Sequence, residues 1–348
     1  MNLQENSLYI DALRRINCIG LDGMSIIITG ATGLLGSCLI DALMLWNRNQ
    51  AKPCKVTAIS RNEQAAKKRF SYYWNDACFS YVEQDVCDQL AGLPENVDYI
   101  IHAASIADPV NIAASPVETL LANVIGTQHL LEYGRSHGMK RFLYVSSGEI
   151  YGQPNAALDD FAEDYCGPID HGSSRACYPA GKRAAEVLCQ SYISQYQIDA
   201  VIVRPCHLFG PTMKREDSHA VAQFLWNAAM REDIILKSAG LVERSHCYVL
   251  DAVSAILLVL AKGDCGKAYN IADRKLQMTI RDFAYKAAEA GGCNVRFENP
   301  SDLEKKGYST VTRAVLDPGR LEALGWKPNH SHSAIKESID ILRGLNSI

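Results

Sequence analysis

The sequence predicts an α/β fold in which helices cover a doubly wound parallel sheet, and two observations near its start carry this prediction. Residues 25–29 form a short apolar run rich in β-branched side chains, typical of a strand buried on both faces. Gly30, Gly33 and Gly36 follow, and apolar residues from 34 to 46 then repeat with helical spacing. A strand, a glycine turn and a helix in this order are the first unit of such a sheet.

The glycine turn predicts a dinucleotide site. Backbone N–H groups at a helix N-terminus point outward, and the helix dipole favours a pyrophosphate there. Gly30 would permit the turn, Gly33 would let the backbone approach the phosphates, and Gly36 would let helix and strand pack closely. The fold is then of the Rossmann type, with an ordinary strand–helix turn as the alternative. Cofactor contacts at this turn are predicted for Gly30, Thr32, Gly33, Leu34, Leu35 and Gly36.

Length and composition exclude several classes of partner. The chain has 348 residues, of which 48% are hydrophobic, enough for one large domain or two fused lobes. Its net charge of −4 favours neither nucleic acid nor an anionic membrane. No apolar run reaches the ~18 residues of a membrane-spanning helix. Residues 1–23 lack the apolar core of a signal peptide and predict a short helix and a lead-in packed on the outside.

Cysteine spacing argues against a metal site. The twelve cysteines are scattered and contain no Cys-x-x-Cys pair. We therefore expect no bound metal, reduced thiols and a cytoplasmic location.

The second and third strands are predicted at 55–59 and 81–84. A dinucleotide fold usually keeps an acid for the adenosine ribose after the second strand, but Arg61 stands there instead. Arg61 would pair with a 2′-phosphate, which makes NADP an alternative to NAD, or stack on adenine; a solvated arginine is the plainer interpretation. Asp85 and Val86, after the third strand, are predicted to lie near the adenine.

Small residues follow the fourth predicted strand, 97–101. Ala103, Ala104 and Ser105 would let a flat cofactor come close, whereas His102 is interpreted as a core histidine.

The next helix is predicted at 116–136, with Ser115 as its cap. Asn123 lies on an apolar face of this helix, and a buried asparagine needs hydrogen-bond partners. We expect Asn123 to bind backbone near the active site, with a hydrogen bond between helices as the alternative.

The fifth strand, 141–145, delivers Ser147 and Glu149 to the carboxyl edge of the sheet, where open α/β sheets bind ligands. About thirty residues later, Tyr178 and Lys182 are four apart and share one face of a helix. A lysine ammonium beside a phenol stabilises the phenolate. We therefore expect Lys182 to lower the pKa of Tyr178 until it is a usable base near neutrality.

Over residues 24–330 the sequence resembles the extended short-chain dehydrogenase/reductases that act on nucleotide sugars. It looks most similar to their UDP-glucuronate decarboxylase branch through the stretches around Arg175–Tyr178, Gly181–Arg183 and Arg244–Val249. The motifs that carry the resemblance are Thr29–Gly36, His102–Ser105, Asn123, Ser146–Gly152, Tyr178 with Lys182, Arg204–Pro211, Arg244–Val249 with Asp251, and Tyr269–Ile271.

The resemblance implies a smaller mixed α/β substrate lobe over the active site. Residues 1–23 would be an N-terminal extension. The dinucleotide-binding domain would span 24–205 with returning segments at about 246–275, and the substrate lobe would take 206–245 and 276–348. Helices 116–136 and 178–196 would pair with their symmetry mates in a four-helix bundle, which gives a homodimer.

The resemblance also implies site roles. NAD would remain bound as a reversible oxidant. Tyr178 would take the proton from the sugar 4-hydroxyl while hydride leaves C4, Ser147 would hydrogen-bond that oxygen, and Lys182 would hold the ribose. Further cofactor contacts are predicted for Tyr178, Lys182, Asn123 and Pro205, and substrate contacts for Ser147, Arg175, His207 and Arg244.

The reaction after oxidation depends on residues 147–149. Simple 4-epimerases usually lack a glutamate at the third position, whereas Glu149 is present here. The 4,6-dehydratases commonly use an aspartate at the middle position, which Gly148 cannot supply, and decarboxylases normally have serine there. A 4-ketone makes a C5 carboxylate a β-keto acid. We favour decarboxylation of UDP-glucuronate, with 4-epimerisation, 4,6-dehydration and a non-catalytic dinucleotide sensor as alternatives.

Overall fold

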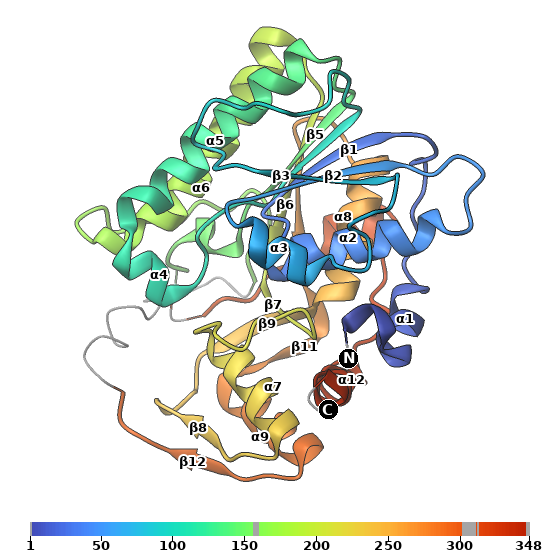
Figure 1. Ribbon diagram of the computed structural model, residues 1–348. Coiled ribbons are helices and arrows are strands. Elements are labelled where there is room, and N and C mark those ends of the chain that lie inside the picture. The colour runs from blue at the N-terminus through green and yellow to red at the C-terminus, as the bar shows by residue number, and fades with distance from the viewer. Residues whose placement is uncertain (1, 156–159, 301–310, 312, 346–348) are drawn as a thin grey trace.

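A seven-stranded parallel sheet forms the centre of the protein, as predicted (Figure 1). The computed structural model describes residues 2–155, 160–300, 311 and 313–345. The strand order is β10-β6-β5-β4-β1-β2-β3, and each neighbouring pair is parallel. The strands are β1 (Ser25–Thr29), β2 (Lys55–Ser60), β3 (Phe79–Glu83), β4 (Tyr99–His102), β5 (Arg141–Val145), β6 (Ala200–Pro205) and β10 (Ala268–Ile271).

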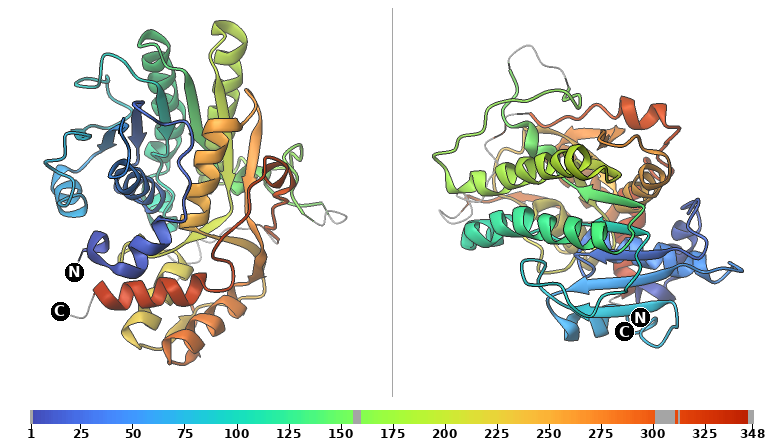
Figure 2. Two further views of the ribbon diagram at one scale, coloured as in Figure 1. Left: turned by 90° about the vertical axis from the view of Figure 1, so that its right-hand side faces the viewer. Right: turned by 90° about the horizontal axis from the view of Figure 1, so that it is seen from above.

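Helices cover both faces of this sheet because alternate strand residues point to opposite sides. Ile26 and Ile28 pack in the core that contains α2 (Leu34–Asn47) and α8 (Val249–Lys262). Ile27 packs in the second core, beneath α5 (Pro116–Ser136) and α6 (Cys177–Tyr196), which lie side by side (Figure 2). The shorter helices α3 (Glu63–Arg69) and α4 (Pro109–Ala114) lie at the edges.

Ser115 caps α5 differently from the prediction. It occupies the N-cap position, but its side chain makes no capping hydrogen bond. Its carbonyl oxygen instead accepts hydrogen bonds from the backbone and the hydroxyl of Thr119.

A smaller assembly lies beyond the carboxyl edge of the large sheet (Figure 1). Two small sheets have the orders β11-β9-β7 and β12-β8. Their strands are β7 (His207–Phe209), β8 (Ile234–Leu236), β9 (Glu243–Tyr248), β11 (Asp273–Thr279) and β12 (Val295–Phe297). The helices here are α7 (Ala220–Met230), α9 (Ile280–Gly291) and α12 (Ala334–Leu345), whereas α11 (Gly319–Ala323) packs against β10 of the large sheet. β9 and β11 pair with each other and cross the predicted boundaries at 245 and 275.

Two further predictions concern this part of the chain. The spacing of Thr279 and Asp282 predicts a helix start, and Gly291-Gly292 predicts its end. Both predictions are confirmed: Thr279 and Asp282 cap α9 reciprocally, and Gly292 ends the helix in the left-handed conformation. In the segment 276–348 that was assigned to the substrate lobe, residues 301–310, 312 and 346–348 lie outside the described residues. Within the described ranges, no helix is both long and apolar enough to cross a bilayer.

The N-terminal segment is more than an outer lead-in, because part of it is buried. η1 (Leu3–Glu5) and α1 (Ser7–Leu13) precede the sheet. The Tyr9 hydroxyl donates to Asp41 Oδ2 at 2.7 Å, and Gln4 Nε2 donates to Asp41 Oδ1 at 2.9 Å. Arg69, from α3, forms an ion pair with the same carboxylate, which is fully buried in α2. Asp41 thus joins three segments of the chain.

Replacing Asp41 by alanine is expected to destabilise the protein by about 3–5 kcal/mol, because the Arg69 guanidinium would remain partly buried without its partner. Urea unfolding would measure this loss. Asp11→Ala is the control, since its ion pair with Arg14 is solvent-exposed and its removal should leave the unfolding midpoint unchanged. Equal midpoints for the two variants would show that Asp41 does not hold the N-terminal segment.

Candidate active site

The glycine turn has the close packing that the sequence predicted. Gly30 has a φ of +67°, and a Cβ atom there would lie 2.6 Å from the carbonyl oxygen of Ala103. A Cβ atom at Gly36 would overlap the Gly30 carbonyl, so α2 approaches the turn more closely than any other residue permits. Gly33 is the N-cap of α2, and its contact with phosphates stays a prediction. The turn thus brings tightly packed backbone to the N-terminus of α2.

The residues after β4 lie against this turn. Thr29 Oγ1 accepts the Ala104 N–H at 3.1 Å and lies 2.7 Å from Nδ1 of His102. Thr29 and His102 therefore share one buried hydrogen bond between β1 and β4. Burial, and next the charge of Lys182, lower the pKa of His102 to about 3. His102 is a neutral core residue, as interpreted from the sequence.

Arg61 is not a free arginine at the adenine end of the site. Its guanidinium lies 3.7 Å from Asp85, although it remains 63% exposed. Asp85 also accepts the Cys87 N–H, and Val86 is buried against Gly126. The carboxylate beside Arg61 partly neutralises the charge that a 2′-phosphate would need.

Asn123 is fully buried and satisfies both ends of its amide. Its Nδ2 donates to the Thr119 carbonyl of its own helix at 2.8 Å. Its Oδ1 accepts from Ser105, after β4, and from Tyr144 in β5, both at 3.2 Å. Asn123 therefore links the backbone of α5 to two strand ends beside the site.

Tyr178 and Lys182 lie together on α6, but their electrostatics differ from the prediction. Lys182 Nζ donates to the Val145 carbonyl at 2.7 Å and lies 5.8 Å from the centre of the Tyr178 ring. Burial, and next the charge of Glu149, raise the pKa of Tyr178 to about 12. Burial lowers the pKa of Lys182 to about 7. The prediction that Lys182 brings the pKa of Tyr178 near neutrality is wrong, because burial of the phenol raises this pKa and the ammonium donates to a carbonyl instead.

Ser147, Glu149 and Arg175 form the next part of the site. Ser147 Oγ accepts the Glu149 N–H at 3.1 Å and begins η2 (Gly148–Tyr151). Arg175 Nη2 donates to both Glu149 oxygens, at 2.9 and 2.8 Å. The other two nitrogens of Arg175, Nε and Nη1, are buried and have no hydrogen-bond partner among the described residues. Glu149 is therefore bound by one nitrogen of Arg175, and the arginine's other two nitrogens could donate to a further group.

His207 and Arg244 form a second polar pair, on β7 and β9. Arg244 Nη1 lies 2.8 Å from His207 Nε2, and an arginine can only donate, so the histidine carries its proton on Nδ1. Burial, and next the charge of Arg244, lower the pKa of His207 well below its usual value. Arg244 Nε is also buried without a partner in the described part of the chain. Pro205 lies beside this pair, at the end of β6.

A cluster that sequence analysis missed bridges the large sheet and α7. Asp108 caps α4 and accepts from the backbone and hydroxyl of Ser218 at 2.7 and 2.6 Å. Asp217 accepts from His219 N and Nδ1. Asp108, Asp217 and His219 have a spacing suited to a metal ion, but both oxygens of Asp108, Oδ1 of Asp217 and Nδ1 of His219 are engaged in hydrogen bonds. The pair Asp108-Pro109 is a recognisable helix start in the sequence. Its contact with Ser218, 110 residues away, could not be predicted from local sequence.

Comparison with protein families identifies one match. The model of the NAD dependent epimerase/dehydratase family matches residues 26–272. UDP-glucuronic acid decarboxylase 1 of Danio rerio is 30% identical over 310 residues, which cover 88% of this chain and 69% of that protein. UDP-glucuronic acid decarboxylase 5 of Arabidopsis thaliana is 30% identical over 308 residues, which cover 88% of this chain and 85% of that protein.

Solved structures share the fold. The dTDP-glucose 4,6-dehydratase DesIV of Streptomyces venezuelae, solved with NAD bound, has a TM-score of 0.77 at 25% identity, with coverage of 92% of this chain and 97% of that one. The UDP-glucuronic acid 4-epimerase of Bacillus cereus, in complex with UDP-glucuronic acid and NAD, has a TM-score of 0.76 at 19% identity, with coverage of 92% and 100%.

The buried lysine generates a prediction about stability and pH. The pKa of Lys182 is about 7 in the folded protein and close to 10.4 in an unfolded chain, so the unfolded state binds more protons between these values. Lys182→Met should therefore have a larger free energy of unfolding than the native protein at or below about pH 7. This difference should shrink as pH rises toward about 9.5, because the native protein becomes more stable over this range.

Urea unfolding of both proteins across this pH range would measure the change in that difference. Lys140→Met is the control, because the pKa of exposed Lys140 is raised beside Asp98, and the lysine stays charged throughout. A pH-independent difference for Lys182→Met would contradict the lowered pKa.

Proposed function

The chain belongs to the NAD-dependent epimerase/dehydratase family, and on that premise we propose that it decarboxylates UDP-glucuronate. Membership makes it a nucleotide-sugar-modifying enzyme with NAD as its cofactor. The observation that carries the proposal is the Arg175–Glu149 pair, in which the arginine keeps two buried donors free among the described residues.

The residues of the glycine turn fit NAD. Gly30 and Gly36 let β1, the turn and α2 pack closely, and the turn leads directly into the N-terminus of α2, where a pyrophosphate is favoured. We propose that Thr32, Leu34 and Leu35 line this site, and that Arg61, already beside Asp85, lies against the adenine rather than against a 2′-phosphate. When bound, NAD supplies a reversible acceptor for hydride.

Tyr178 is the proposed base for the sugar 4-hydroxyl, with Ser147 as the hydrogen-bond partner of the same oxygen. A pKa of about 12 must fall in the substrate complex before Tyr178 can act near neutrality. The hydrogen bond from Ser147 and the charge of Arg175 already lower this pKa, whereas the charge of Glu149 raises it. We infer that Arg175 serves partly to offset Glu149 beside the phenol. We propose that Lys182, whose ammonium donates to the Val145 carbonyl, also holds the ribose.

The charges around Glu149 favour a substrate with an acid on the sugar. Arg175 and Arg244 bring two guanidinium groups to one carboxylate, and Arg244 Nε adds a further buried donor without a partner in the described chain. Buried cations require partners, so this surplus favours an anion beyond Glu149. A C5 carboxylate bound by these arginines would lie near Glu149. Like-charge proximity would raise its energy, and loss of CO2 from the 4-keto acid would relieve it.

A second candidate reaction is 4-epimerisation of the same UDP-uronate. The Bacillus cereus neighbour is a UDP-glucuronic acid 4-epimerase, and its substrate would meet the same arginines. Dehydration at C6 is less favoured, because Gly148 offers no acid between Ser147 and Glu149. A purely sensory role is disfavoured, because Ser147, Tyr178 and Lys182 are all present.

We propose a homodimer formed through α5 and α6. These helices lie side by side (Figure 2). One face of each packs on the sheet, but both helices also carry exposed apolar side chains. The most exposed are Val117 and Val187, each at 63%, with Leu120 and Leu121 beside Val117. Symmetric pairing of two such surfaces would bury them in a four-helix bundle. We place the enzyme in the cytoplasm, in keeping with its twelve free cysteines.

The purified protein is expected to convert UDP-glucuronate with a radiolabelled carboxylate to CO2 and a UDP-pentose in equal amounts, without added reductant. Arg175→Gln should lower kcat/KM for this substrate by about 100-fold, because a buried carboxylate would lose its partner. Arg141→Gln is a matched control: both arginines are 16% exposed and paired with a carboxylate, but Arg141 lies at the amino end of β5.

Two results would contradict decarboxylation. Conversion of UDP-glucuronate to UDP-galacturonate, with the label retained, would favour the epimerase. Interconversion of UDP-glucose and UDP-galactose with UDP-glucuronate untouched would show that the arginines do not select an acid.

The dimer proposal is tested at Val187, whose side chain is exposed and remote from the catalytic residues. Val187→Asp should place two charges in the bundle and convert a dimer of about 77 kDa to a monomer of 38.3 kDa in analytical ultracentrifugation. Tyr285→Asp is the control, because it places the same charge on an exposed apolar residue of α9, outside the proposed bundle, and it should leave the mass unchanged. A native protein that sediments as a monomer at micromolar concentration would contradict the proposal.

A further inference from the structure

Gly148 is glycine because of a neighbour and not because of its own backbone. Its φ lies outside the left-handed region, so a side chain would meet no backbone strain. A Cβ atom at Gly148 would instead lie 3.0 and 3.3 Å from the two Cδ atoms of Leu316, and 3.4 Å from the Pro205 carbonyl oxygen. A residue 168 positions later in the chain therefore occupies the space beside the turn that joins Ser147 to Glu149.

Leu316 cannot easily move aside. Its side chain is 3% exposed and packs in a small cluster beneath the site. The buried members of this cluster are Ile150, Tyr151, Phe161, Ala272 and Leu316. Ile150 and Tyr151 belong to η2, the same turn that begins at Gly148. Displacing the leucine would thus disturb the turn that carries Glu149.

The backbone around Leu316 is hydrogen-bonded on both sides. Towards β9, the Ser245 N–H donates to the Ala314 carbonyl, and the Leu316 N–H donates to Ser245 Oγ, both at 3.0 Å. On the other side, the Phe161 N–H donates to Val315 at 2.8 Å, and the Asp317 N–H donates to Phe161 at 3.0 Å. Because Ser245 follows Arg244, the same hydrogen bonds also position Arg244, which is proposed to bind the substrate.

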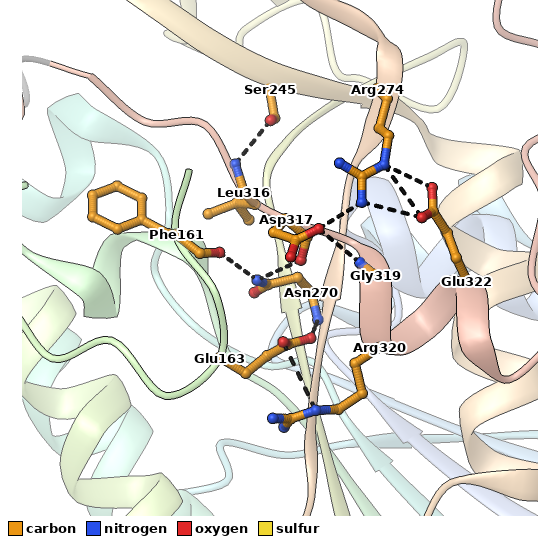
Figure 3. A network of polar contacts seen from close by, with 10 residues as sticks. All are labelled: Phe161, Glu163, Ser245, Asn270, Arg274, Leu316, Asp317, Gly319, Arg320 and Glu322. Carbon is orange, nitrogen blue, oxygen red and sulfur yellow. Dashed lines mark hydrogen bonds and ion pairs between the residues drawn. The ribbon is translucent and has the colours of Figure 1, made fainter. Parts of the chain in front are cut away.

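A polar network holds this segment in place from the other end (Figure 3). Asn270 donates through Nδ2 to the carbonyls of Phe161 and Asp317, at 2.8 and 3.0 Å. Arg274 bridges Asp317 and Glu322, and Arg320 lies 3.8 Å from Glu163, whose carboxylate accepts the Asn270 N–H. Hydrogen bonds to β9, to β10 and to residues 161–163 thus hold the segment that carries Leu316 against Gly148.

We propose that Leu316 is a specificity-determining residue: its side chain fills the space beside Gly148, so that the turn presents only Ser147 and Glu149 to the sugar and no third acid or base. Residues 148 and 316 then act as one unit, and a polar residue at 148 requires a smaller residue at 316. The inference rests on the proposed function only for the identity of the sugar.

A double-mutant cycle tests the pair. Gly148→Ser should lower the unfolding temperature and reduce kcat by about tenfold, because Leu316 must be displaced. In the double variant Gly148→Ser with Leu316→Ala, kcat should recover at least about fivefold relative to Gly148→Ser, and the unfolding temperature should exceed that expected from adding the two single effects. Leu260→Ala, which truncates an equally buried leucine in α8, is the matched control and should not rescue Gly148→Ser.

A titratable group distinguishes specificity from mere packing. In the Leu316→Ala background, Gly148→Asp should add an ionisation to the pH profile of kcat that Leu316→Ala alone lacks, because a carboxyl would then reach the reacting sugar. An unchanged profile would overturn the proposal. So would additive effects of Gly148→Ser and Leu316→Ala, or a Gly148→Ser variant as stable and active as the native protein.

The cycle separates this inference from the proposed reaction. Unfolding temperatures need no substrate, so coupling between residues 148 and 316 is measurable even if UDP-glucuronate is not turned over. In that case kcat and its pH profile would be measured with whichever sugar of a UDP-, dTDP-, GDP- and CDP-sugar panel the native protein converts.

Discussion

Burial of charge at the carboxyl edge of the seven-stranded sheet is the constraint on which the rest of the site depends. Lys182, Arg175 and Arg244 are all largely withdrawn from water, and Glu149 is the carboxylate that pairs with Arg175. The cost of such burial appears as a lowered pKa for Lys182 and a raised one for Tyr178. Cationic side chains with unpaired hydrogen-bond donors favour anionic ligands. A dinucleotide and a nucleotide uronate are both anions.

The sequence predicted those parts of the fold that are encoded locally. Residues 25–46 could be assigned as strand, turn and helix because β-branched residues, three glycines and a helical repeat lie side by side in the chain. The same holds for the Thr279–Asp282 cap of α9. The placement of Asn123 was also foreseeable, since a buried amide on an apolar helix face must find partners, although its contacts with Ser105 and Tyr144 were not.

Interactions between distant segments were not predictable in the same way. The pKa of Tyr178 was expected to fall because its neighbour in the helix is a lysine, but the sequence does not show how deeply the phenol is buried or that the ammonium binds Val145. The ion pair of Arg175 with Glu149 spans 26 residues, and the contact of Asp108 with Ser218 spans 110. Such pairings follow from the three-dimensional arrangement of the sheet and α7, which no local pattern encodes.

Gly148 shows how a residue at a reactive turn can be misinterpreted when it is considered alone. From the sequence, its glycine is only the absence of a catalytic acid. In the structure it is one half of a contact, because the space beside it belongs to Leu316, and Leu316 is held by Ser245, Phe161 and Asn270 through its own segment. A change at 148 therefore alters packing before it alters chemistry. In the proposed mechanism, the acid–base chemistry of the turn is for this reason set partly by a segment that carries no acid or base to the site itself.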